Sequence, residues 1–296
     1  MTMLRIMVSR HSAFYSPLLA TFAAGFLEQE GLDGSYHVLP AGRSVGEFLA
    51  AGEIEVAQSA VSYSWGVLEK GGQPPALHFA QINQRDGFFI ASRKPDPAFS
   101  FDKLLQGKLM YVHGGQPAAM LRYALHKRGV DLSRIAVINA GNTEQMLTAF
   151  RAGQGDYFHE QGPYPQQLEQ EGVAQVVASV GETFGPVAFS SLAATRGWLQ
   201  RPEAPKFMRA YRKSRAWVRS GPAADVAGKL QALFPGTAAA ALARAIKAYQ
   251  QLGCWDGDAA IDPASYEVAL DVFQHAGAIS RRYPFAEMVV QPPDAG

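Results

Sequence analysis

Short apolar runs alternate with helical stretches that end in glycine through the first part of the chain. An apolar run from Leu4 to Val8 is followed by a helical stretch that ends at Gly31. A second run from Tyr36 to Leu39 precedes a short helix that ends at Gly52, and a third run spans Ile54 to Ala57. Apolar runs bounded by turn residues favour strands, and apolar residues at helical spacing favour helices. The pattern therefore predicts a strand–helix–strand–helix–strand unit.

The same order recurs about a hundred residues later. A strand from Leu109 to Val112, a helix ending at Gly129, a strand from Ile135 to Ile138 and a helix ending at Gly153 precede Asp156 to Phe158. The offsets between matching glycines are 98, 99 and 101 residues, for Gly31 and Gly129, Gly42 and Gly141, and Gly52 and Gly153. Glycine ends helices in all α/β proteins, so coincidence is the alternative. Three matched glycines favour two similar lobes.

The two units predict an α/β fold with two similar lobes of mostly parallel sheet flanked by helices. Parallel strands joined by right-handed crossovers bind ligands beyond their carboxyl ends, so we expect a ligand cleft between the lobes. Two apolar crossover segments, near Phe88–Ser92 and Val187–Leu192, would hinge the lobes. We expect lobe 1 to comprise residues 1–91 plus 187–296 and lobe 2 residues 92–186. The remaining chain predicts four helices and a surface tail, at Pro205–Arg219, Ala223–Leu233, Thr237–Leu252, Pro263–His275 and Pro284–Gly296.

Composition excludes several classes of protein. The 296 residues carry a formal net charge of +1, which gives no general field for gripping nucleic acid or an anionic membrane. Cys254 is the single cysteine, so neither an internal disulfide nor a zinc site with two thiolates can form. No apolar run reaches the roughly 18 residues of a membrane span. We expect no nucleic-acid partner, no direct membrane insertion and no cofactor.

The start of the chain allows two interpretations of its location. Leu18 to Leu27 follows Arg5 and Arg10 and is apolar enough for a signal peptide. However, its large apolar residues recur at helical spacing, and no clear cleavage site follows. We expect a periplasmic location if a signal peptide has been trimmed and a cytoplasmic one if Met1 is the native start.

Five segments, taken together, resemble a known family. They are His11 to Pro17, Gly25 to Leu32, Ala51 to Ala57, Phe101 to Lys108, and Ile261 to Ile279. Their order and spacing resemble the type II periplasmic-binding-protein fold, specifically the solute-binding proteins for thiamine-type pyrimidines, sulfonates, taurine and nitrate. The cysteine-rich motif of a related pyrimidine-synthesising branch cannot be present in a chain with one cysteine.

The resemblance implies two lobes that close on a small planar or anionic solute, as the substrate-binding component of an ABC-type uptake system. The implied partners are a small-molecule ligand and an ABC transporter permease, and we expect a monomer or weak dimer. A cytosolic enzyme on the same fold, using Glu160 or a cleft histidine as acid–base, is the alternative. A detached sensor domain is a further one.

The loops that follow the predicted strands are the expected ligand contacts, because free backbone N–H groups there favour anions. The candidate contact residues are His11, Phe14, Tyr15, Arg43, Ser44, Ser59, Ser62, Tyr63, Gly114, Gly115, Gln116, Asn142, His159, Glu160 and Tyr164. Arg43 could pair with a sulfonate or carboxylate, and Glu160 could accept from an amino group. His11, His113 and His159 each follow a predicted strand, and a metal site is conceivable only if all three meet.

Two further motifs have a functional and a plain interpretation. Gly42 to Gly46 matches G-x-S-x-G, which would make Ser44 a hydrolase nucleophile, with Asp258 or Asp262 and His275 following in triad order. Too few strands precede it for that fold, which argues against a hydrolase. Lys206 to Arg219 is basic and free of acidic residues, which fits either a solvated helix face or a dock for an acidic partner.

Overall fold

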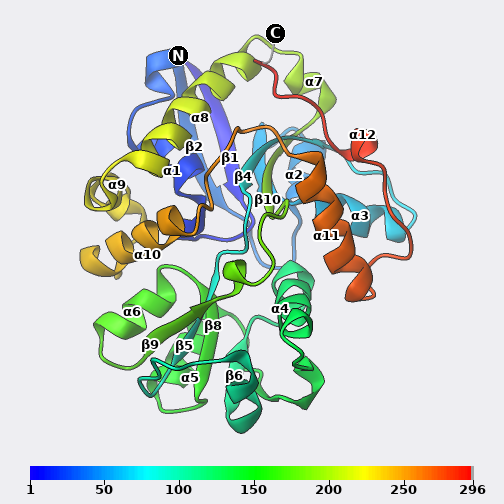
Figure 1. Cartoon of the computed structure of the whole chain (residues 1–296). Helices are drawn as coiled ribbons and strands as arrows, with labels where there is room; N and C mark the ends of the chain where they lie inside the picture. Colours follow the sequence, from blue (N-terminus) through cyan, green and yellow to red (C-terminus); the bar gives the residue numbers. More distant parts are fainter. Residues whose placement is uncertain (295–296) are drawn as a thin grey trace.

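Two lobes, each built on a five-stranded sheet, make up the chain (Figure 1). The computed structural model describes residues 1–294. The first sheet has the order β2-β1-β3-β10-β4, with strands β1 (Thr2–Val8), β2 (Leu32–Val38), β3 (Val56–Ser59), β4 (Leu77–Asn83) and β10 (Ser190–Ala194). The second has the order β7-β6-β8-β5-β9, with strands β5 (Phe88–Ser92), β6 (Lys108–Tyr111), β7 (Ala136–Ile138), β8 (Tyr157–Gln161) and β9 (Gln175–Ser179).

The two sheets share one topology, which confirms the prediction of two similar α/β lobes. In the first sheet β1 pairs in parallel with β2 and β3, and in the second β6 pairs in parallel with β7 and β8. Each sheet also holds one antiparallel strand, β10 in the first and β5 in the second. β5 is the first strand after the chain passes into the second lobe, and β10 is the first strand after it returns to the first lobe. The sheets are therefore mixed, with four strands running one way and one running against them.

The chain crosses between the sheets twice, at residues 84–87 and 180–189. The first crossing ends where β5 begins, and β5 pairs with β8 and β9, so the segment Phe88–Ser92 is a strand of the second sheet. The predicted boundary between lobe 1 and lobe 2, between residues 91 and 92, therefore lies before the last residue of β5. The structure places the change of lobe a few residues earlier, at the crossing 84–87. The crossings pass so close that a Cβ on Gly181 would lie 2.3 Å from the carbonyl oxygen of Asp86. Only glycine fits at that contact.

Helices cover both sheets. The first lobe carries α1 (Ser16–Ala23), α2 (Val45–Ala50), α3 (Val61–Glu69), α7 (Arg196–Leu199), α8 (Glu203–Ser220), α9 (Ala223–Leu230), α10 (Ala239–Gln251), α11 (Pro263–His275) and α12 (Phe285–Met288). The second carries α4 (Gly115–Lys127), α5 (Thr143–Arg151) and α6 (Tyr164–Gln170), and short 3-10 turns lie at Ala13–Tyr15, Glu28–Glu30, Phe101–Gln106, Leu132–Arg134, Val180–Glu182 and Gln231–Leu233. Among the described residues, no helix has the length and apolar character that a membrane crossing requires.

The two ends of the chain pack on the first lobe. Residues 18–27, which are apolar enough for a signal peptide, begin within α1, where Leu18 and Leu19 are fully buried in the core. The predicted tail contributes the buried side chains of Met288 and Val289, and Val289 forms a parallel bridge with His78 of the edge strand β4. The last two residues of that tail lie outside the described part of the chain.

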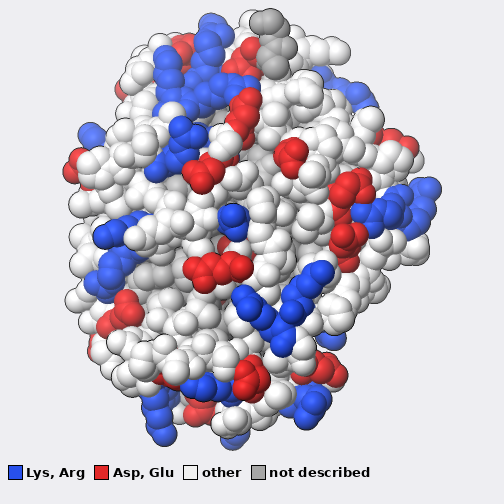
Figure 2. Space-filling view, in the orientation of Figure 1, with Lys and Arg blue, Asp and Glu red and all other residues white. Residues whose placement is uncertain are grey.

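The basic face of α8 is paired within the chain. Arg209 and Lys213 both bond to Glu30, while Arg212 pairs with Asp258 and Asp294. Figure 2 shows Lys and Arg side chains gathered over α8 with acidic side chains beside them. Three of the six basic side chains in this stretch are thus paired with the chain's own carboxylates, which supports the plain interpretation of a solvated helix face over a dock for an acidic partner.

The lobes are fastened to each other on the side of α10. The Tyr249 hydroxyl accepts the Gly162 N–H at 2.6 Å and donates to the Gly87 carbonyl at 3.0 Å. The buried Ser12 hydroxyl donates to the Gly162 carbonyl at 2.8 Å. These bonds join α10 and the start of the first lobe to the end of β8.

Candidate functional site

A cavity of about 570 Å³ lies between the lobes. This volume falls in the range of small-molecule sites. Residues of both lobes and of the second crossing line it: Ser9, Arg10, Tyr15, Leu39, Arg43, Ser44, Val45, Gln58, Ser59, Ala60, Ser62, Tyr63, Gly66, Phe88, Val112, Gly114, Gly115, Gln116, Pro117, Gln161, Phe189, Ser190, Phe273, Ala278 and Ile279. The cavity is thus the predicted interlobe cleft.

Two helices begin at this cavity with their first N–H groups uncapped by side chains. Ala60 precedes α3 and Gly114 precedes α4, and neither start has a capping side chain. Both residues line the cavity, as do Ser62, Gly115 and Gln116. Gly114 has a φ of 83°, which a residue with a side chain rarely adopts. Uncapped helix starts offer N–H donors and a positive partial charge, so they favour an anion.

Arg10 brings a full positive charge to the cavity wall. It lies two residues after β1, and its side chain reaches across to the second lobe, where Nη1 donates to Glu160 Oε1 at 2.5 Å. Glu160 is fully buried at the end of β8 and also accepts from the Thr143 hydroxyl and the Gln161 N–H, at 2.9 and 2.8 Å. The guanidinium carbon also lies 5.8 Å from the centre of the Phe88 ring. Glu160 therefore holds the Arg10 side chain in place. The other N–H groups of the guanidinium remain available to a ligand.

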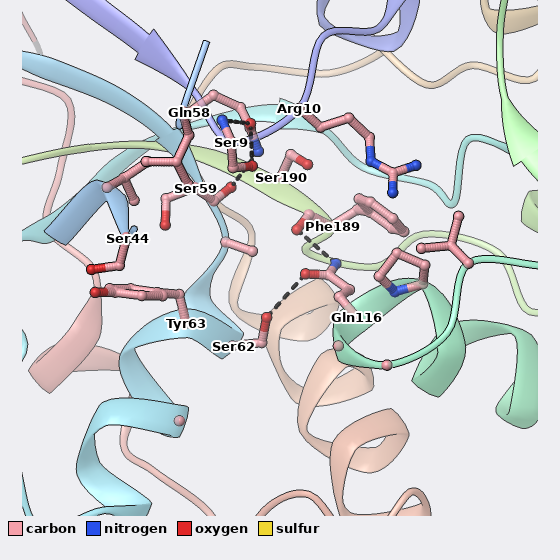
Figure 3. Close-up of a pocket in the computed structure, with 18 of the residues that line it drawn as sticks. Ser9, Arg10, Ser44, Gln58, Ser59, Ser62, Tyr63, Gln116, Phe189 and Ser190 are labelled. Carbon is pink, nitrogen blue, oxygen red and sulfur yellow. Dashed lines mark hydrogen bonds between the residues drawn. The ribbon is translucent and has the colours of Figure 1, made fainter. Parts of the chain in front are cut away.

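Gln116 joins the two lobes at the cavity. Its Oε1 accepts from the Ser62 hydroxyl at 3.0 Å, and its Nε2 donates to the Phe189 carbonyl at 2.8 Å. Gln116 belongs to α4 of the second lobe, while Ser62 belongs to α3 of the first. Figure 3 shows this chain of hydrogen bonds across the cavity. A separation of the lobes would break it.

Hydroxyl and amide groups line the first-lobe wall. Gln58, in β3, accepts from both the backbone N–H and the hydroxyl of Ser9, at 2.9 and 2.7 Å, and donates to the Ser59 carbonyl at 3.2 Å. Ser190 lies beside this group in Figure 3, and Ser44 and Tyr63 lie at the far end of the view from Arg10. The wall thus offers neutral hydrogen-bonding groups.

Aromatic side chains supply the apolar part. Phe88, Phe189 and Phe273 line the cavity together with Tyr15 and Tyr63. Burial raises the pKa of the Tyr15 hydroxyl, so this group is neutral at physiological pH. These rings can bury the apolar body of a ligand.

Nine of the predicted contact residues lie on the cavity: Tyr15, Arg43, Ser44, Ser59, Ser62, Tyr63, Gly114, Gly115 and Gln116. Arg43 lies at the rim of the cavity. The Arg43 Nε donates to Glu47 at 2.5 Å, and the arginine side chain is half exposed. Ser44 caps α2 by accepting the Glu47 N–H. The two residues therefore already have partners within the chain.

Three of the other six predicted contacts are in the protein interior. Phe14 is fully buried, and its ring centre lies 5.0 Å from that of Tyr249 and 5.4 Å from that of Phe189. His159 is fully buried and stacks on Phe88 at 4.6 Å. Burial lowers the pKa of His159 to about 3. Glu160 is turned toward Arg10, so it is no free acceptor for an amino group.

The remaining three predicted contacts lie outside the cavity wall. His11 shares a 2.5 Å hydrogen bond with the Tyr36 hydroxyl and packs on Phe234 at 4.3 Å. The Tyr164 hydroxyl donates to the His11 carbonyl at 3.5 Å. Asn142 forms a capping box at the start of α5. Each residue therefore has a structural partner away from the cavity.

The metal and hydrolase alternatives are not assembled. His11 packs on Phe234 and His159 on Phe88, while His113 packs at a tilt on Tyr111, with ring centres 4.0 Å apart. Within residues 1–294, no three His, Cys, Asp or Glu residues form a group that could hold a metal ion.

The proposed triad partners of Ser44 are engaged elsewhere. Asp258 pairs with Arg212, and Asp262 caps α11. His275 packs on His126 with ring centres 4.3 Å apart. None of these contacts leads to Ser44.

Sequence reasoning missed several residues on the cavity wall: Ser9, Arg10, Gln58, Phe88, Gln161, Phe189 and Ser190. Ser9 and Arg10 directly follow β1, so the rule about strand ends would have found them had the loop been started two residues earlier. Phe189 ends the second crossing and Ser190 begins β10, and the rule about strand ends covers neither position.

Comparisons with known proteins agree with this architecture. The sequence profile of the family described as "NMT1/THI5 like" matches residues 14–225. A Bacillus subtilis (strain 168) protein named "Putative binding protein YtlA" is 27% identical over 294 residues, which are 98% of this chain and 88% of that protein.

Solved structures show the same fold. The alkanesulfonate-binding protein SsuA from Xanthomonas axonopodis pv. citri, bound to MOPS, superposes with a TM-score of 0.74 at 18% identity and covers 98% of this chain and 99% of its own. The periplasmic aliphatic sulphonate binding protein SsuA from Escherichia coli gives a TM-score of 0.73 at 16% identity and covers 97% of each chain.

Proposed function

The chain belongs to the NMT1/THI5-like family, and from this premise we propose that it binds a small organic anion in the cavity between its lobes. In this role it is the substrate-binding component of an ABC-type uptake system, and the membrane permease of that system is its partner. The name of its Bacillus subtilis relative and the sulfonate ligands named for its structural neighbours support this proposal. The role places the chain on the outer side of the cytoplasmic membrane.

The cavity wall at Arg10 is the observation that carries the proposal. A guanidinium group with free N–H donors faces the same cavity as the uncapped starts of α3 and α4. Guanidinium groups and helix starts both stabilise sulfonate, carboxylate or phosphate groups. Both sources of positive potential line one cavity, Arg10 and α3 from the first lobe and α4 from the second.

Binding would couple to closure of the lobes. The anion would contact Arg10 and α3 of the first lobe and α4 of the second at once. A ligand that contacts both lobes stabilises their closed arrangement by its differential affinity for it. The two crossings at 84–87 and 180–189 would act as the hinge.

Calorimetric titration with hexanesulfonate, hexanoate and phenyl phosphate tests the proposal. We expect binding of at least one of these anions with a 1:1 ratio. The Arg10→Gln variant should lose this binding. Arg151→Gln, which removes an exposed arginine paired with Glu171, is the matched control and should bind like the wild type. Binding that is unchanged in Arg10→Gln would contradict the proposal.

A further inference from the structure

We propose that the cavity selects organic anions whose body carries no ammonium group. This inference rests on the proposed anion-binding function and narrows it. It separates alkyl and aryl anions, which the cavity would take, from zwitterions of the same length, such as amino acids and aminosulfonates.

No carboxylate faces the cavity. Among the described residues that line it, none is Asp or Glu. Two carboxylates lie near it, and both are engaged. Glu160 is fully buried behind Arg10 and accepts from three donors, and Glu47 pairs with Arg43 at the rim. A ligand ammonium would therefore find no opposite charge.

Two glutamine side chains and two backbone carbonyls on the wall are already occupied as acceptors. Gln58 Oε1 accepts two hydrogen bonds from Ser9, and Gln116 Oε1 accepts one from Ser62. The carbonyls of Phe189 and Ser59 accept from these same two glutamine side chains. An ammonium group has three donors to satisfy and pays a large desolvation cost when it is buried without a partner.

The other side-chain acceptors on the wall are neutral, and they include the hydroxyl groups of Ser59, Ser190 and Tyr63. The buried Oε1 of Gln161, a cavity-lining residue, has no hydrogen-bond partner among the described residues. Neutral oxygens can accept from a hydroxyl or amide N–H of a ligand, but they supply no charge that would offset the desolvation of an ammonium group. Neutral polar groups on the ligand body are therefore compatible with this wall.

The rest of the wall is apolar. Phe88 comes from the second sheet, Phe189 from the second crossing and Phe273 from α11, so rings from three parts of the chain surround the cavity. With a volume of about 570 Å³, the cavity has room for a ligand body well beyond the anionic group itself. Burial of alkyl or aryl carbons against these rings is favourable, and burial of a cation there is not.

Three ligands of equal chain length test the inference on the full-length protein by calorimetry: hexanesulfonate, 6-aminohexanoate and hexylammonium, with hexanoate as the carboxylate reference. We expect hexanesulfonate or hexanoate to bind, and 6-aminohexanoate to bind at least about 100-fold more weakly than hexanoate. Hexylammonium should not bind. Equal affinities for hexanoate and 6-aminohexanoate would overturn the inference and leave the proposed anion binding standing. Absence of binding by every anion would overturn both.

A variant with a new carboxylate supplies the converse test. Gln58→Glu keeps the size of the side chain and the acceptor for Ser9 while it places a negative charge on the wall. We expect its affinity ratio of 6-aminohexanoate to hexanoate to rise by at least about tenfold over the wild type. Gln274→Glu adds the same charge on the exposed face of α11 and should leave the ratio unchanged. An equal change in both variants would contradict a role for the cavity wall.

Discussion

Arg10 of the first lobe donates to Glu160 of the second at 2.5 Å, and this ion pair joins two residues that are 150 positions apart in the chain. The carboxylate is fully buried, while a quarter of the arginine side chain is exposed. The pair therefore does two things at once. It compensates a buried charge at the lobe junction, and it fixes the orientation of the guanidinium group that lines the cavity.

Removal of Arg10 alone should cost both stability and binding. Arg10→Gln leaves the Glu160 carboxylate buried without its cation, and the loss of one partner of a buried pair typically destabilises by about 3–5 kcal/mol. The double variant Arg10→Gln/Glu160→Gln removes the stranded charge and should recover most of that stability. It should not recover anion binding. Urea unfolding and calorimetry on both variants measure the two effects, and recovery of binding in the double variant would contradict the assignment of Arg10.

Gln116 should set how far the lobes separate without ligand. Gln116→Ala breaks the hydrogen bonds to Ser62 and Phe189, so the open arrangement gains population. We expect a larger radius of gyration by small-angle X-ray scattering without ligand and an affinity lower by about tenfold. In Gln274→Ala, which loses a hydrogen bond within the first lobe, both values should stay at the wild-type level. A compact, fully active Gln116→Ala protein would show that this contact does not control closure.

The absence of a side chain at Gly46 should allow the Tyr63 hydroxyl to occupy its position beside the cavity. A Cβ at Gly46 would lie 2.2 Å from that hydroxyl and 3.2 Å from Pro75, so Gly46→Ala should move the Tyr63 ring and change the affinity for the anion by about tenfold. Gly66 is the matched control because it lines the same cavity within α3, and a Cβ there meets nothing within 4 Å. Gly66→Ala should bind normally and unfold at slightly higher denaturant. Equal affinities of the two variants would refute the role of Gly46.

Acid should weaken ligand binding through a histidine pair at the lobe junction. His126 of α4 and His275 of α11 pack with ring centres 4.3 Å apart, and Tyr123 packs on both rings. Burial, His126, Arg122 and Lys127 lower the pKa of His275, so its uncharged form is favoured in this arrangement. Asp131 is the acidic residue on the hollow beside the pair, which Arg122 also lines.

The sign of the effect follows from which form the contact favours. The pKa of His275 is lowered while its ring packs on His126, so the proton binds more readily once the two lobes separate and this contact is broken. Protonation below about pH 6.5 therefore favours separated lobes. The affinity for hexanesulfonate should fall between pH 7.5 and 5, although the sulfonate itself stays charged. His275→Gln should make that dependence shallower. A pH profile that is identical in the variant and the wild type would exclude the pair as its cause.

His159 should make the fold sensitive to acid. Full burial lowers its pKa to about 3, against an unfolded value near 6.5. As the pH falls, the unfolded chain therefore binds this proton before the folded protein does. The contribution of neutral His159 to the free energy of unfolding is complete above about pH 6.5. It is lost as the pH falls toward 3, by up to about 1.4 kcal/mol per pH unit. His159→Phe keeps the stacking on Phe88 and removes the titration. Urea unfolding at pH 7.5 and 5 should show a smaller acid loss in the variant, and an equal loss would contradict this account.

The two-lobed fold could be predicted because its signals are local. Gly31 and Gly129 end matching helical stretches with φ of 72° and 73°, and both precede a strand that pairs in parallel with the first strand of its unit. By contrast, the edge strands β4 and β9 carry no such repeat and were not predicted. The start of β2 at Leu32 was also missed, because its register with Thr2 is set by pairing and not by its own composition.

The site could be predicted in part, for a similar reason. Strand ends point to Ser59 and Gly114 because parallel strands end at the same edge of their sheet. The role of Arg10 depends on Glu160 in the other lobe, and no local pattern links the two. The burial of Phe14 depends likewise on Tyr249 of α10, and that of His159 on Phe88 of β5, so each depends on a residue that is distant in the chain.

A crystal structure of the protein with bound hexanesulfonate tests the central claim most directly. The account predicts the sulfonate group within hydrogen-bond distance of the Arg10 guanidinium and of backbone N–H groups at the start of α3 or α4, with the alkyl chain against Phe88, Phe189 or Phe273. A sulfonate bound outside this cavity, or inside it without a contact to Arg10, would contradict the account.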